Sequence, residues 1–361
     1  MRRVTTLVAV AATAALALAA CSSSSSGSTS TSPSAGASSA ASSSAPAGGA
    51  ATKVKVGLAY DVGGRGDQSF NDSAATGLDK AKAEFKGLEV KELEATQGET
   101  DAQKEERLRL LADGGYNPVI GVGFAYATAL KKVAAEFPDI KFAIIDDDSI
   151  KAPNVTPLVF AEQEGSFLVG VIAAQASKSG NIGYIGGVNT PLLKKFEAGY
   201  TAGAKAVNPA IKVQAKYLTE PPDFSGFGDP AKGKTVAQGM LDAGADVIYA
   251  AAGGSGSGAF EAVAAAKKLA IGVDSDQYLT AAAAVKPVIL TSMLKRVDVA
   301  VYNEIKAAVD GKPLTGTQTF DLKVDGVGYS TSNDAVKPYT AKADEFKAKI
   351  VSGEIKVPTA P

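Results

Sequence analysis

The pattern of hydrophobic and polar positions alternates along most of the chain between short apolar runs and amphipathic segments. Three early runs have strand character and are followed or separated by helical patterns: VKVGLAY (54–60), PVIGVG (118–123) and KFAIID (141–146). A second series consists of TPLVFA (156–161), NIGYIGG (181–187), IKVQAKYL (211–218), DVIYAAAG (246–253) and AIGVD (270–274). Strands that alternate with helices in this way predict an α/β fold with parallel sheets.

The patterned part of the chain, residues 53–357, is long enough for two domains of roughly 150 residues each. We expect the run VILTSML (288–294) and the helix around Val297–Val309 to return to the first sheet, and TFDLKVDGVG (319–328) to finish the second. The expected division is residues 53–160 plus about 288–315 for an N-terminal lobe, and residues 161–287 plus about 316–357 for a C-terminal lobe.

The beginning of the chain does not share this pattern. Residues 1–20 combine a basic start, an apolar stretch and a small-residue end, which is typical of a secretory signal peptide. The run LAAC (18–21) resembles the bacterial lipobox, in which the cysteine is lipidated; the alternative is a plain signal peptide followed by a stray cysteine. Residues 21–52 are then a lipidated Cys21 and a disordered linker rich in Ser, Ala and Gly. We expect a protein anchored by lipid on the extracytoplasmic face of the cell membrane.

Composition removes several classes of function. The chain has no histidine and one cysteine, which excludes a Ser-His-Asp or Cys-His mechanism, an imidazole zinc site and an internal disulfide. With 37 basic and 38 acidic side chains, it lacks the electrostatic footprint of a nucleic-acid-binding protein. Its glycine-rich segments match neither the dinucleotide fingerprint nor the P-loop, so we expect no cofactor and no metal. We expect a monomer.

The residues that follow the apolar runs are the candidates for a binding site, because ligands of open parallel sheets bind at the carboxyl ends of the strands. The runs end in Asp61, Asp146, Gly253, Asp274 and Lys295, among others. Ionised carboxylates accept hydrogen bonds and repel phosphate, so three of them with one lysine suit a neutral ligand rich in hydroxyl groups. The alternative is that each aspartate only caps a turn or helix and that the lysine lies on the surface.

Two polar loops carry phenylalanines. Phe70 lies in DVGGRGDQSFND (61–72), and Phe224 and Phe227 lie in EPPDFSGFGDPAKGK (220–234). Two rings from separate lobes would sandwich a flat ring, which together with a hydroxyl-rich part describes a nucleoside. A helix start is the other interpretation of the first loop, with a Ser-x-x-Asp capping box and the phenylalanine as a hydrophobic staple.

Four segments resemble the basic membrane protein family of substrate-binding lipoproteins. DVGGRGDQSFN (61–71) is similar to its opening signature D-x-G-x-x-D-D-x-S-F-N. GFGDPAKGK (226–234), GADVIYAAAGGSGSG (244–258) and AIGVDSDQ (270–277) resemble further family segments in the family's order. Gly66 departs from the pattern, because it occupies the first place of the usual acidic pair and leaves Asp67 alone.

The resemblance implies a type I periplasmic-binding fold, with two doubly wound Rossmann-like lobes joined by crossing hinge strands. It also implies delivery of a purine nucleoside to the permease of an ABC importer. By the same resemblance, the base stacks between Phe70 and Phe227, while Asn71 bonds its edge and Asp61 faces it; Phe227 is preferred to Phe224 because it directly precedes GDPAKGK. The ribose would contact Asp146, Asp274, Lys295 and the Gly253 backbone.

Two other functions stay open. A sugar or furanose-signal binding protein of the same fold would also use carboxylates and an aromatic platform. A surface nucleoside hydrolase would use the carboxylates to activate water, although the sequence has no closely spaced aspartate cluster of the calcium type. We expect a binding protein rather than an enzyme.

The lipobox-like run generates the first prediction. We expect Cys21→Ser to leave an uncleaved, unacylated precursor or to release the protein into the medium, because the serine hydroxyl replaces the thiol that is lipidated. Metabolic labelling with a fatty acid measures the outcome, with the parent chain as the labelled control. Continued labelling of Cys21→Ser would show that the lipid is not on this cysteine.

Overall fold

The computed structural model describes residues 54–361, so the expected signal peptide, the lipidated cysteine and the linker lie outside the described residues. The strands are β1 (Lys55–Ala59), β2 (Glu89–Leu93), β3 (Val119–Gly121), β4 (Phe142–Ile145), β5 (Val155–Phe160), β6 (Asn181–Val188), β7 (Lys212–Thr219), β8 (Val247–Ala251), β9 (Leu269–Asp274), β10 (Ile289–Lys295), β11 (Gln318–Phe320) and β12 (Val327–Tyr329). The α-helices are α1 (Phe70–Glu84), α2 (Asp101–Asp113), α3 (Ala127–Glu136), α4 (Glu162–Ala176), α5 (Pro191–Val207), α6 (Pro230–Asp242), α7 (Gly256–Ala265), α8 (Gln277–Thr280), α9 (Val297–Val309) and α10 (Lys337–Val351).

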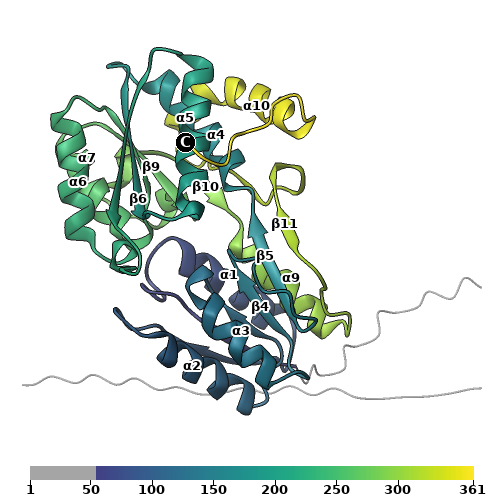
Figure 1. The fold of residues 1–361 in the computed structure, drawn as a ribbon. Helices are drawn as coiled ribbons and strands as arrows, with labels where there is room; N and C mark the ends of the chain where they lie inside the picture. The colour runs from purple at the N-terminus through teal and green to yellow at the C-terminus, as the bar shows by residue number, and fades with distance from the viewer. Residues whose placement is uncertain (1–53) are drawn as a thin grey trace, which may run out of the picture. The chain divides into compact units, whose positions relative to one another are not determined.

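These elements form two six-stranded sheets (Figure 1). The N-terminal lobe is the sheet β11-β5-β4-β3-β1-β2 with α1, α2, α3 and α9, and the C-terminal lobe is the sheet β12-β10-β9-β8-β6-β7 with the other helices. Neighbouring strands are parallel except β10 and β12, which are antiparallel. Every residue of the central strands β4 and β8 is buried, as both faces of a parallel sheet are covered by helices. The predicted α/β fold with two doubly wound lobes is confirmed.

The chain passes between the lobes three times, after β5, after β10 and after β11. The expectation that residues 288–294 return to the first sheet is wrong, because β10 pairs with β9 in the second sheet. Only part of residues 319–328 finishes the second sheet, since β11 pairs with β5 and β12 pairs with β10. The expectation failed because a buried strand has the same apolar pattern in either sheet. The element that returns to the N-terminal lobe is α9, which packs against α1 (Figure 1).

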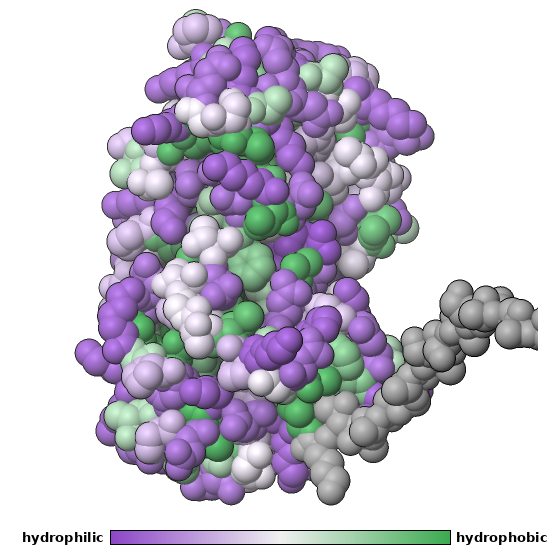
Figure 2. All heavy atoms as spheres, turned by 90° about the vertical axis from the view of Figure 1, so that its right-hand side faces the viewer, coloured by the Kyte–Doolittle hydropathy of each residue, from purple (hydrophilic) through white to green (hydrophobic). Residues whose placement is uncertain are grey.

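The surface of the described residues is largely polar on the face in Figure 2, with hydrophobic side chains in small patches between the polar ones. Within residues 54–361, none of the helices combines the length and the apolar character that crossing a bilayer requires.

Close packing of α4 against α5 positions one wall of the cleft between the lobes. A Cβ atom at Gly203 of α5 would lie 2.0 Å from the Phe167 carbonyl oxygen of α4, and one at Gly170 would lie 2.2 Å from the Tyr200 carbonyl oxygen. Glycine at these positions lets the two backbones approach each other. The N-terminal end of α5, which carries Phe196, is thereby held at the carboxyl end of β6.

We expect Gly203→Ala to lower the free energy of unfolding by about 1–3 kcal/mol, because the added methyl group overpacks the contact between α4 and α5. Gly239→Ala is the matched control, since Gly239 is an exposed position of α6 where a Cβ meets no atom within 4 Å. This control should raise the free energy of unfolding by roughly 0.5–1 kcal/mol, as alanine is the better helix former. Urea unfolding of both variants measures the difference, and equal effects would contradict the packing argument.

Candidate ligand-binding site

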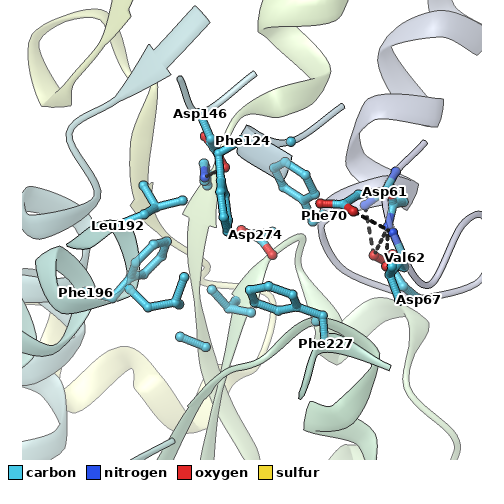
Figure 3. A pocket seen from close by; sticks show the side chains of 17 residues that line it. Asp61, Val62, Asp67, Phe70, Phe124, Asp146, Leu192, Phe196, Phe227 and Asp274 are labelled. Carbon is cyan, nitrogen blue, oxygen red and sulfur yellow. Dashed lines mark hydrogen bonds and ion pairs between the residues drawn. The ribbon is translucent and has the colours of Figure 1, made fainter. Parts of the chain in front are cut away.

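The carboxyl ends of the two sheets border a cavity of about 550 Å³, a volume that includes the part open to solvent. All of the sequence-predicted ligand-binding residues line it: Asp61, Phe70, Asn71, Asp146, Phe227, Gly253, Asp274 and Lys295 (Figure 3). Residues that are far apart in the sequence therefore meet because the strands that carry them are parallel within each sheet and present their carboxyl ends to the same space.

The aromatic walls of the cavity come from both lobes. Phe70 is the first residue of α1, and Phe227 is the last residue of the short 3₁₀ helix η2 (Ser225–Phe227) in the C-terminal lobe. Their rings lie on facing sides of the cavity (Figure 3). Phe224 is not among the lining residues, because its ring packs edge-on against Phe124 with the ring centroids 5.7 Å apart. The geometry thus favours Phe227 over Phe224 as the second ring.

Lys295 connects the two lobes. Its Nζ lies 2.6 Å from Asp146 Oδ2, at the end of β4, and 3.4 Å from Glu162 Oε1, at the start of α4. Burial by itself lowers the pKa of Lys295, but the attraction of Asp146 and Glu162 outweighs burial and leaves this pKa raised. Burial raises the pKa of the Asp146 carboxyl to about 6, against the opposing attraction of Lys295. The pair is charged, buried and shared between the lobes.

Two of the strand-end aspartates adopt a left-handed backbone conformation. The φ angles are +70° at Asp146 and +63° at Asp274, a region that aspartate tolerates better than most residues. Within the described residues, neither carboxylate accepts a hydrogen bond from a backbone N–H, so neither acts as the expected alternative of a turn or helix cap. Burial raises the pKa of the Asp274 carboxyl to about 7, which Lys295 and a hydrogen bond from Ser69 partly offset.

The loop before α1 is held together by Asp67. Its carboxylate accepts hydrogen bonds from the backbone N–H groups of Ser69, Asn71 and Asp72 at 2.8, 2.9 and 3.1 Å. Asp72 in turn accepts from the N–H groups of Gly66 and Gln68. The expected capping box is therefore wrong, because the hydroxyl of the N-cap serine makes no hydrogen bond to the helix that it precedes.

Asn71 is used within the same loop. Its Oδ1 accepts from the Asp61 N–H at 3.0 Å, and its Nδ2 donates to Asp67 Oδ2 at 3.0 Å and to the Val62 carbonyl oxygen at 3.4 Å. Both amide hydrogens are directed at protein acceptors. The structure thus places Asn71 as a support of Asp61 and Asp67, rather than as a donor that points freely into the cavity.

Several lining residues were missed by the sequence analysis. Phe124 follows β3, and Leu192, Leu193 and Phe196 come from the first turns of α5. These residues come after the strand ends, in the segments that follow β3 and β6. The apolar pattern PLLKKF directly after β6 is the signal that would have found the α5 wall. Glu162, the buried partner of Lys295, likewise opens the helix after β5.

The lobes are in contact beside the cavity. The Ser69 hydroxyl, at the start of α1, donates to Asp274 Oδ2 at 2.6 Å, and the Ser275 hydroxyl donates to the Ser69 carbonyl oxygen at 2.8 Å. Ser69 is fully buried. The structure therefore represents a closed arrangement in which a serine of one lobe holds a carboxylate of the other.

Two α/β lobes with a cavity at the carboxyl ends of both sheets are the architecture of the type I periplasmic-binding class. A solved structure of an ABC transporter solute-binding protein from Aeropyrum pernix K1 matches with a TM-score of 0.74 and 33% identity, covering 85% of this chain and 93% of that chain. The chain belongs to the Bmp family of PnrA-like ABC transporter substrate-binding proteins, which matches residues 53–360.

Two relatives illustrate the family. The ABC transporter nucleoside-binding protein BmpA of Lactococcus lactis subsp. cremoris is 35% identical over 324 residues, covering 85% of this chain and 90% of that protein. An uncharacterized lipoprotein of Pyrococcus abyssi is 39% identical over 310 residues, covering 82% of this chain and 73% of that protein. The protein is thus an ABC transporter substrate-binding protein, a class that binds a ligand and works with a transporter permease.

The contact between Ser69 and Asp274 predicts how closure can be weakened. We expect Ser69→Ala to reduce the ratio of closed to open protein by roughly ten- to a hundredfold, because hydrogen bonds to charged groups contribute about 1.5–3 kcal/mol. Spin labels on cysteines introduced by Leu110→Cys and Gln238→Cys, one exposed position in each lobe, report the distance between the lobes.

Ser73→Ala serves as the control for this measurement. The Ser73 hydroxyl oxygen accepts from the Asp298 N–H at 3.1 Å, a contact between α1 and α9 within the N-terminal lobe. This change should lower stability without changing the distance between the lobes. Identical distance distributions for Ser69→Ala and Ser73→Ala would show that the bond to Asp274 does not stabilise closure.

Proposed function

We propose that this protein captures a purine nucleoside between its lobes and delivers it to the permease of an ABC importer. The observation that carries the proposal is the pairing of two phenylalanine rings from opposite lobes with buried carboxylates and one lysine in a single cavity. The rings suit a flat base, and the carboxylates suit the hydroxyl groups of a ribose. The name of the Lactococcus relative, a nucleoside-binding protein, supports the same ligand class.

In this proposal the base lies between Phe70 and Phe227. Stacking on an aromatic side chain is worth about 1–3 kcal/mol per base, and a ring on each face encloses the base when the lobes close. Asp61 lines the cavity beside Phe70 (Figure 3). In this proposal it faces the edge of the base. Asn71 takes the supporting role that its hydrogen bonds to Asp61 and Asp67 indicate, in place of the base contact expected from the sequence.

The ribose lies at the other end of the cavity in this proposal. Asp274 and Asp146 accept hydrogen bonds from its hydroxyl groups, and Asp146 Oδ1 has no protein partner among the described residues. Lys295 and the Gly253 N–H donate to ribose oxygens. Charge-assisted bonds of this kind contribute more than neutral ones. A phosphorylated nucleoside would instead meet carboxylates with its own negative charges, which disfavours nucleotides.

The anchoring of the protein is also part of the proposal. Relatives named as lipoproteins and as ABC transporter substrate-binding proteins imply an extracytoplasmic, membrane-anchored location. We assign the anchor to a lipid on Cys21, followed by the Ser-rich linker, so that a monomeric body stays close to its permease. Relatives of this family bind substrates for transport, and we propose the same role without a chemical step.

Mass spectrometry of small molecules released by denaturing the purified protein tests the ligand class directly, and a purine nucleoside is the expected species.

Calorimetry then separates the contributions of the stacking ring and of the ribose contact to binding. Phe70→Ala should weaken adenosine, inosine and guanosine alike by roughly ten- to a hundredfold, because it removes one stacking face. Asp274→Ala should weaken guanosine by a similar factor but guanine much less, since the free base has no ribose to lose.

Phe85→Ala is the matched control for Phe70→Ala. Phe85 is the C-cap residue that follows α1, and it stacks on Tyr302 with the ring centroids 6.0 Å apart, outside the cavity. This variant should lose stability and keep its affinity. Unchanged guanosine binding by Asp274→Ala would overturn the ribose assignment, and binding of a pentose or hexose in place of nucleosides would overturn the ligand class.

A further inference from the structure

Lys104 is a buried cation that the proposed binding role leaves unused. It lies on α2 and is only 4% exposed, although a buried ammonium group is costly unless partners compensate it. Within residues 54–361, its hydrogen bond goes to the exposed Asp101, at the long distance of 3.4 Å. Its Nζ also lies 5.6 Å from the centroid of the Phe224 ring, which belongs to the other lobe. A contact between the lobes therefore supplies part of the compensation.

The Phe224 ring meets two side chains of the N-terminal lobe. Lys104 lies over the ring, and Phe124 packs edge-on against it with the ring centroids 5.7 Å apart. Both arrangements are attractive, because a cation and the edge of a ring are each drawn to the negative face of an aromatic ring. Phe124 lines the cavity, whereas Phe224 does not (Figure 3). Phe224 thus contacts the wall of the cavity and not its contents.

The loop that carries Phe224 is fixed to its own lobe. At its start, the hydroxyl group of Thr219, the last residue of β7, donates to the Asp223 carbonyl oxygen at 2.6 Å. Further along, the Ser255 hydroxyl donates to the Gly226 carbonyl oxygen at 2.7 Å. The loop therefore moves with the C-terminal lobe, while the two partners of its ring move with the N-terminal lobe.

This contact lies at the edge of the C-terminal sheet that is remote from the connections between the lobes. β7 is the terminal strand, and β6, β8 and β9 separate it from β10, after which the chain crosses to α9. The displacement of a point on a rotating lobe grows with its distance from the hinge. The bond from Ser69 to Asp274, at the end of β9, lies nearer to the hinge. The ring contact therefore has the greater leverage on opening.

We propose that Phe224 and Lys104 form a latch that holds the lobes closed and slows the release of the bound ligand. Phe224 is a positioning residue in this role, because it acts through Phe124 and the opposite lobe. The inference deepens the proposed function, since it assigns control of the ligand's residence time to side chains that do not touch the ligand. The structure thereby gives a use to the phenylalanine of this loop that does not stack on the ligand.

The distance between the lobes tests the latch without reference to any ligand. Spin labels on Leu110→Cys and Gln238→Cys report the ratio of closed to open protein, both in the absence of ligand and with guanosine. Phe224→Leu, which keeps an apolar side chain and removes the ring, should lower this ratio by roughly ten- to a hundredfold. Phe224→Tyr keeps the ring and should retain the ratio of the parent protein.

A double-mutant comparison tests the partner. Lys104→Met keeps the apolar stem and removes the charge, so it should lower the ratio of closed to open protein by roughly two- to thirtyfold. In the Phe224→Leu background the same change should have about a twofold effect or less, because the ring is already gone. Lys104 also attracts the Asp61 carboxylate, an effect that is present in both backgrounds and cancels in the comparison.

Lys286→Met is the matched control for Lys104→Met. The Lys286 Nζ lies 4.9 Å from the centroid of the Tyr278 ring, and both residues belong to the C-terminal lobe. This variant removes a contact of the same kind within one lobe, so it should leave the distance between the lobes unchanged. Thermal unfolding checks that every variant folds.

The rate of guanosine release, measured by stopped flow, is the second readout and rests on the proposed function. Phe224→Leu should release guanosine roughly ten- to a hundredfold faster, with little change in association, because the latch forms after the ligand has entered. The inference is overturned if folded Phe224→Leu and Lys104→Met keep the parent's ratio of closed to open protein, or if Phe224→Leu releases guanosine at the parent's rate. Guanosine that does not bind the parent protein would overturn the proposed function alone, because the distances without ligand still judge the latch.

Discussion

The ion pair between Lys295 and Asp146 is the interaction on which the closed arrangement of the lobes depends. Its Nζ and Oδ2 atoms lie 2.6 Å apart, and both side chains are nearly inaccessible to water. Removing one partner of such a pair costs about 3–5 kcal/mol, because a buried charge is left uncompensated. β10 of the C-terminal sheet supplies the lysine, and the residue after β4 of the N-terminal sheet supplies the aspartate. The ion pair therefore links the two sheets near the point where the chain passes from β10 into α9.

Around this pair the cavity gathers more carboxylates than cations. The carboxyl groups of Asp61, Asp146 and Asp274 are buried in this arrangement, and burial raises their pKa values to about 6, 6 and 7. Charging them in a closed, empty cavity is therefore unfavourable. A ligand that supplies hydroxyl and N–H donors offsets this cost. Under the proposed function, recognition and closure thus depend on the same oxygen atoms, and the bond from Ser69 to Asp274 links them directly.

The sequence alone was sufficient for the features that depend on neighbouring residues. Apolar runs of four to eight residues predicted the buried strands, and the residue after each run predicted which side chains reach the edge of a sheet. Asp61, Asp146 and Asp274 could be found in this way, and Phe70 stood out because it is an aromatic residue in a polar loop. The α/β class followed from the alternation of strands with helices, whereas the two-lobed organisation came from the length of the patterned segment and from the family resemblance.

Only the tertiary structure decided the features that depend on residues far apart in the chain. The pattern of β10 is that of a buried strand in any sheet, so its pairing with β9 could not be derived from it. Ser69 has the sequence position of a helix cap, yet its hydroxyl bonds to Asp274, more than two hundred residues away. The side-chain amide of Asn71 makes its hydrogen bonds within its own loop, to the Asp61 N–H and the Asp67 carboxylate. Periodicity and spacing report the local preference of a segment for strand, helix or turn. Hydrogen-bond partners in different lobes are set by how distant segments pack, and a local sequence pattern holds no information on that packing.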